Sequence, residues 1–107
     1  MDGMEQIAFT MIAAIGEAKT LIMRAITEAR ENKISEGKDL LKQANEKLGV
    51  AHNEHFGLIQ EEASGGKVEF GILFMHAEDQ LMTTGLMKDM ADQMIDMYEK
   101  MYELTGS

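Results

Sequence analysis

Residues 70–87 read FGILFMHAEDQLMTTGLM, an apolar helical pattern that a histidine and an aspartate interrupt. His76 and Asp79 are three positions apart, so on a helix they lie one turn apart on the same side. Asp79 is also in register with Met75, Met82 and Leu86, at the spacing of an apolar helical face. A carboxylate within such a face is energetically costly unless something pairs with it. The position of Asp79 therefore needs a physical cause.

Helical periodicity extends from this stretch over the whole chain, because no segment alternates with period two for long. The strongest breaker is the sequence SGGK at residues 64–67, and Ser35 is expected to cap the second helix. The three helices are expected at residues 4–32, 36–63 and 68–104. Short turns between amphipathic helices predict an all-α, up-down-up three-helix bundle in which residues 1–107 form a single domain.

Each expected helix carries a line of apolar residues at heptad-like spacing. The line on the first helix is Met4, Ala8, Met11, Ile15, Ala18, Ile22, Ala25 and Ala29. The line on the second is Leu41, Ala44, Leu48, Ala51, His55 and Leu58. The third helix carries two lines, one of Met75, Met82, Leu86 and Met90 and the other of Leu73, Met87, Ala91, Met94, Tyr98 and Met101. A lone bundle needs only one such face, so the second line predicts a partner subunit. Four glycines within the helices are expected to mark close helix approaches: Gly16, Gly49, Gly57 and Gly85.

The composition excludes several classes of protein. The chain has 107 residues, a net charge of −9 and no cysteine, so disulfides and thiolate metal sites are ruled out. The acidic surface disfavours nucleic acid and favours partners with basic faces. The N-terminal sequence is acidic where a secretory signal would be basic, and no apolar run approaches the roughly 18 residues of a membrane span. A cytoplasmic location is expected.

The chain has three histidines that could carry chemistry. His52 and His55 are spaced to share a metal, although a structural role is the simpler interpretation, with His55 hydrogen-bonded in the core. His76 is either structural or a neutral imidazole nucleophile suited to phosphoryl transfer, which needs chiefly positioning and charge compensation. Asp79 either faces solvent, or meets its symmetry copies at a subunit interface. Carboxylates that meet there would share protons or bind a hard divalent cation.

The sequence from Met75 to Thr84, MHAEDQLMTT, resembles the signature of the lactose/cellobiose-type enzyme IIA of the bacterial phosphoenolpyruvate-dependent sugar phosphotransferase system. The sequence LIQEEA at residues 58–63, before the glycine turn, also resembles the end of that family's second helix. The likeness extends over residues 4–104. The chain departs from the commonest motif at Glu78, where glutamine is frequent, and at Gln80, where histidine is frequent.

The resemblance implies a homotrimer with nine helices, which would explain the second apolar line. It implies that His76 accepts a phosphoryl group from the phosphocarrier HPr and passes it to a cysteine of the cognate enzyme IIB. Asp79 matches the aspartate that each subunit contributes to one metal ion on the threefold axis, usually Mg²⁺. The sugar would be of the lactose, cellobiose or chitobiose type, and the membrane would be reached only through the enzyme IIC transporter.

Two alternatives remain besides this phosphotransferase component. One is a non-catalytic helical adaptor that binds a partner through the methionine-rich third helix. The other is a metal-binding bundle that uses His52, His55 and His76.

Overall fold

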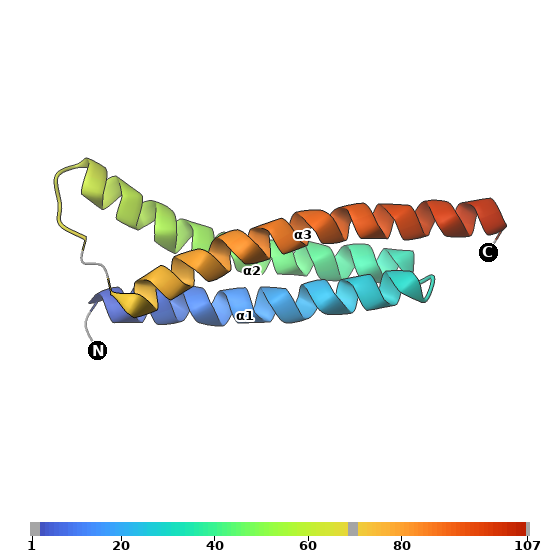
Figure 1. Ribbon diagram of the computed structural model, residues 1–107, viewed down its shortest axis with the longest axis horizontal. Coiled ribbons are helices and arrows are strands. Elements are labelled where there is room, and N and C mark those ends of the chain that lie inside the picture. The colour runs from blue at the N-terminus through green and yellow to red at the C-terminus, as the bar shows by residue number, and fades with distance from the viewer. Residues whose placement is uncertain (1–2, 69–70, 107) are drawn as a thin grey trace.

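The computed structural model describes residues 3–68 and 71–106. Three helices account for most of them: α1 at Gly3–Arg30, α2 at Ile34–Ala63 and α3 at Ile72–Thr105. In Figure 1, α1 and α3 run in the same direction and α2 runs in the opposite direction, which confirms the up-down-up order. The bundle is elongated, with extents of 58 × 24 × 18 Å.

The core contains the apolar lines that were predicted for the first two helices. All members of the α1 line are buried except Met4, which is partly buried. The α2 line is buried at Leu41, Ala44, Leu48, Ala51 and Leu58, whereas His55 is half-buried. The regular spacing of these side chains therefore determines which faces of α1 and α2 meet.

The structure divides the two predicted apolar lines of α3 only in part. Leu73, Met87, Ala91 and Tyr98 of one line pack against the core, but Met94 and Met101 of the same line are exposed. The most buried residues of the helix are Phe74, Ala77, Leu81, Thr84, Ala91 and Ile95. α3 is apolar around more of its circumference than one neighbour can cover. The sequence pattern alone therefore does not determine which face of α3 points toward the core.

The opposite side of α3 carries a long row of exposed apolar side chains. They are between 51% and 89% exposed and follow one another at intervals of three, four or seven residues, which keeps them on one side of the helix. We call them the α3 row: Ile72, Met75, Met82, Leu86, Met90, Met97, Met101 and Leu104. Isolated exposed apolar residues are common, but a continuous row of this length is typical of an interaction surface.

The turn between α1 and α2 consists of residues 31–33. Asn32 has a φ of 62°, a left-handed conformation that asparagine tolerates better than most residues. The Lys33 amide donates to the Glu28 carbonyl, and α2 then begins at Ile34. The prediction that Ser35 caps α2 was wrong, because Lys33 occupies the cap position and no side chain makes a cap hydrogen bond.

The second connection contains the glycine pair expected to break the chain. Gly65 has a φ of 94°, which is strained for any residue with a side chain. The prediction that the third helix begins at residue 68 was also wrong, because Gly71 is extended and α3 begins at Ile72. Phe70, which opens the stretch quoted above, lies outside the described residues.

The prediction that four glycines within the helices mark close helix approaches was wrong. A β-carbon added to Gly16, Gly49, Gly57 or Gly85 would meet nothing within 4 Å, so none of them marks a close approach within the subunit. The close approach occurs at Gly37, where an added β-carbon would lie 2.9 Å from the Ala25 carbonyl oxygen and 3.3 Å from the Ala29 β-carbon. Gly37 therefore allows the start of α2 to pack directly on the backbone of α1.

α1 is long and apolar enough to cross a membrane by length and composition alone, with a mean hydropathy of 1.3 over 18 residues. The statement that no apolar run approaches this length was therefore wrong. A core helix of a bundle passes the same test, and eight residues of α1 are buried against the other helices.

Candidate functional site

His76 and Asp79 lie one turn apart near the start of α3, and both are exposed. The imidazole of His76 makes no hydrogen bond to any residue that the structure describes, so its ring nitrogens are accessible from solvent. Asp79 interrupts the α3 row between Met75 and Met82. Within the described residues its carboxylate makes no ion pair, which leaves its oxygens available to a ligand.

The next turn of α3 connects this region to α1. The Lys19 ammonium, on α1, donates to the side-chain oxygen of Gln80 at 3.5 Å. The Thr83 hydroxyl donates to the carbonyls of Asp79 and Gln80, at 3.0 and 3.3 Å. Lys19 is a residue that the sequence reasoning missed, because it is 61 positions from Gln80 and no local pattern connects the two.

The other two histidines lie on α2. Nε2 of His55 is 2.8 Å from a carboxylate oxygen of Glu78, and both side chains are partly buried. This contact confirms that His55 is hydrogen-bonded, and it gives a structural role to Glu78. His52 is exposed. Residues 76 and 78 point to different sides of a helix, so His55 and His76 do not converge.

Among the described residues, no group of three histidine, aspartate or glutamate side chains is arranged to hold a metal ion within one chain. The alternative site formed by His52, His55 and His76 is therefore not assembled in the subunit. A metal site built from one Asp79 per subunit would need several copies of the chain.

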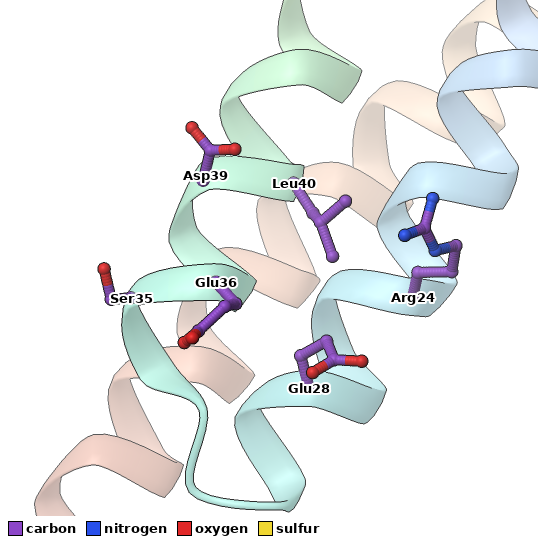
Figure 2. A pocket seen from close by; sticks show the side chains of 6 residues that line it. All are labelled: Arg24, Glu28, Ser35, Glu36, Asp39 and Leu40. Atoms are coloured by element: carbon purple, nitrogen blue, oxygen red, sulfur yellow. The ribbon is translucent and has the colours of Figure 1, made fainter.

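Two surface depressions lie away from His76. A groove of about 510 Å³ between α2 and α3 is lined by His52, His55, Met82 and Leu86, among others. A pocket of about 600 Å³ lies between α1 and α2 beside their connecting turn, and Figure 2 shows Arg24 there with the carboxylates of Glu28, Glu36 and Asp39. Three carboxylates against one guanidinium disfavour a phosphate group in this pocket. His76 lines neither depression, and neither one replaces the surface around His76 as the candidate site.

Electrostatic pairing is extensive elsewhere on the surface. Lys47 lies 2.9 Å from the Glu17 carboxylate, and this hydrogen bond, together with the charge of Glu17, raises the pKa of the lysine above its usual value. Lys38 pairs with Glu99 at 2.9 Å, which joins α2 to α3. These pairs are exposed and screened by water, so they contribute little to stability.

The family model for the lactose/cellobiose-specific IIA subunit of the phosphotransferase system matches residues 6–99, which include His76, Asp79 and all but the ends of the bundle. This chain belongs to that family. It is therefore a phosphocarrier component of a sugar phosphotransferase system. The family membership disfavours the adaptor and the metal-binding bundle as the function of the chain.

The relatives support the assignment along nearly the whole chain. The lichenan-specific phosphotransferase enzyme IIA component of Bacillus subtilis is 40% identical over 104 residues, covering 97% of this chain and 94% of the relative. The crystal structure of the cellobiose-specific enzyme IIA from Bacillus anthracis superimposes with a TM-score of 0.92 at 36% identity, covering 96% of this chain and 94% of that one.

A third similar structure is that of a complex. The IIA(Chitobiose)–HPr complex of the N,N'-diacetylchitobiose branch of the Escherichia coli phosphotransferase system gives a TM-score of 0.80 at 26% identity. The match covers 94% of this chain and 98% of that chain. That protein forms a complex with HPr, and it shares the three-helix fold of this chain.

Proposed function

We propose that His76 is the residue that carries the phosphoryl group, receiving it from phospho-HPr and passing it to a cysteine of the cognate enzyme IIB. The observation that supports this most directly is that His76 is an exposed histidine without a hydrogen-bond partner among the described residues, within the region that the family model matches. Two protein partners must reach the acceptor in succession, which an exposed position on a helix permits. The HPr complex of a structural relative supports the choice of donor.

The transfer consists of two displacements at phosphorus. An unprotonated ring nitrogen of His76 attacks the phosphorus of phosphohistidine on HPr in line, the new N–P bond forms, and the old N–P bond breaks with its electron pair returning to the HPr imidazole. The enzyme IIB thiolate then attacks the same phosphorus, and His76 leaves with the electron pair of its N–P bond. Such transfers depend on positioning and charge compensation, which docked partners and nearby cations supply.

The α3 row supports a second proposal, that three copies of the chain assemble around α3 into a homotrimer with nine helices. Exposed apolar side chains along about nine turns of helix would be covered in such an assembly. Asp79 would bring one carboxylate from each subunit to the threefold axis. Because its oxygens make no ion pair with any described residue and are of the type that hard cations prefer, the residue fits one Mg²⁺ per trimer. The ion would offset most of the charge of the three carboxylates, and Asp79 would hold it in place.

The trimer proposal is tested by sedimentation at micromolar concentration. We expect Asp79→Leu to preserve or strengthen the trimer, because it removes buried charge and leaves an apolar side chain in the row. Asp92→Leu, the same change on α3 outside the row, is the control and should leave the assembly unchanged. A monomeric wild-type protein would refute the trimer, and dissociation of Asp79→Leu would instead indicate an obligatory metal bridge.

The carrier proposal is tested by the intact mass of the protein after incubation with phosphoenolpyruvate, enzyme I and HPr. We expect one acid-labile phosphoryl adduct that is absent from His76→Ala and present in His52→Ala, which removes another exposed histidine. An adduct on His76→Ala would show that another residue is the acceptor. The transported sugar is proposed to be of the lactose, cellobiose or chitobiose type, and the component is proposed to act in the cytoplasm.

A further inference from the structure

The acidic surface creates a problem for phosphoryl transfer that the surroundings of His76 must solve. The chain has 19 acidic and 10 basic residues, so its overall field opposes a doubly negative phosphoryl group. Most basic side chains are already paired with carboxylates and cannot compensate that charge fully. The paired ones are Arg30, Lys33, Lys38, Lys47, Lys88 and Lys100.

Lys19 differs from these residues. Within the described residues it has no carboxylate within 4.0 Å, and its ammonium instead donates to the neutral amide oxygen of Gln80. Glu17, its nearest acidic neighbour in sequence, is bonded to Lys47. The positive charge of Lys19 is therefore not neutralised by an ion pair.

The contact with Gln80 also places that charge beside His76. Residues four apart on a helix share a face, with their β-carbons about 5–6 Å apart, so His76 and Gln80 are neighbours on α3. Lys19 reaches this face from α1, 3.5 Å from the Gln80 oxygen. A lysine has a flexible four-carbon stem and three donors, so the ammonium can turn from the Gln80 oxygen toward a phosphoryl oxygen on His76.

We infer that Lys19 binds the phosphoryl group on His76, and that Gln80 holds the ammonium in place while His76 is unmodified. This inference rests on the proposed role of His76. It identifies a cation within the chain itself that compensates the transferred charge, in addition to any cations that the partner proteins supply. No bond is made or broken by Lys19, because it acts only by hydrogen bonding and charge.

The test measures the equilibrium between phospho-HPr and the phosphorylated chain, which depends on the stability of each phosphorylated protein and not on how the two dock. Lys19→Met should shift the equilibrium toward phospho-HPr by about three- to tenfold, the range expected when a partly exposed charge-assisted hydrogen bond is lost. Lys19→Arg should keep the equilibrium constant close to the wild-type value because the charge is kept. Lys42→Met is the matched control, since Lys42, on α2, is another exposed lysine that makes no ion pair within the described part of the chain.

A second variant, Gln80→Met, removes the oxygen that binds Lys19 while His76 is unmodified. Because only the unmodified form loses a contact, this variant should shift the equilibrium by a smaller factor in the opposite direction, toward the phosphorylated chain. Both shifts should shrink in high salt, which screens the exposed charge. The inference is overturned if Lys19→Met and Lys42→Met give the same equilibrium constant, or if Lys19→Arg behaves as Lys19→Met does. Failure of the carrier proposal would look different, because wild-type protein would then carry no phosphoryl group on His76 at all.

Discussion

Gly37 offers a sharp test of how α1 and α2 pack. In Gly37→Ala, the new β-carbon would lie 2.9 Å from the Ala25 carbonyl oxygen, a backbone atom that cannot rotate away, and 3.3 Å from the Ala29 β-carbon. Overpacking of this kind costs about 1–3 kcal/mol. The higher helix propensity of alanine returns about 1 kcal/mol. We therefore expect a net loss of up to about 2 kcal/mol in the free energy of unfolding.

Gly57→Ala is the matched control for this substitution. It makes the same chemical change in the same helix, but the new β-carbon meets nothing within 4 Å, so the variant should gain up to about 1 kcal/mol from helix propensity. Urea denaturation should be followed by circular dichroism at one fixed protein concentration, because assembly would make stability depend on concentration. The two variants should move the midpoint in opposite directions. If Gly37→Ala is as stable as Gly57→Ala, the helices do not approach as described.

Two further substitutions test the core. Thr84 is 1% exposed, and its hydroxyl has no hydrogen-bond partner among the residues that the structure describes. Thr84→Val should therefore raise the free energy of unfolding by about 1 kcal/mol in the same denaturation experiment, and a loss would show that the hydroxyl is bonded in the folded protein. Ile22 is fully buried in α1, so Ile22→Ala should cost about 2–5 kcal/mol by thermal or urea unfolding, and a cost below 1 kcal/mol would contradict its burial.

The sequence predicted the parts of the fold that depend on one periodic face. The α1 line from Ala8 to Ala29 is buried at every position because a single spacing of small and branched apolar residues has only one way to face the other helices. The α2 line behaves in the same way. The glycine pair ahead of α3 was also correctly predicted, because Gly65 adopts a conformation that other residues avoid.

The features that sequence did not predict depend on contacts that are distant along the chain. α3 has apolar residues on several sides, so the pattern placed Met94 and Met101 in one line with core residues such as Ala91, although both methionines are exposed. The role of Gly37 depends on where the backbone of α1 lies, and the contact between Lys19 and Gln80 depends on how α1 packs beside α3. A periodicity measured within one helix contains none of this information. The motif, by contrast, identified His76 and Asp79 as candidates through resemblance, and their roles stay predictions.

The proposed roles of His76 and Asp79 are not independent, because the two residues lie one turn apart on α3. A carboxylate at that distance repels a phosphoryl group on the histidine, and three carboxylates near the threefold axis would repel it more strongly. A cation held by Asp79 would remove that repulsion, so cation binding and phosphorylation should favour each other by the same factor. We therefore expect that chelating Mg²⁺ shifts the equilibrium with phospho-HPr away from the phosphorylated chain. Asp79→Leu should abolish this dependence, since it removes both the repulsion and the ligand. An equilibrium constant that is equally sensitive to Mg²⁺ in wild-type protein and in Asp79→Leu would show that the cation acts elsewhere.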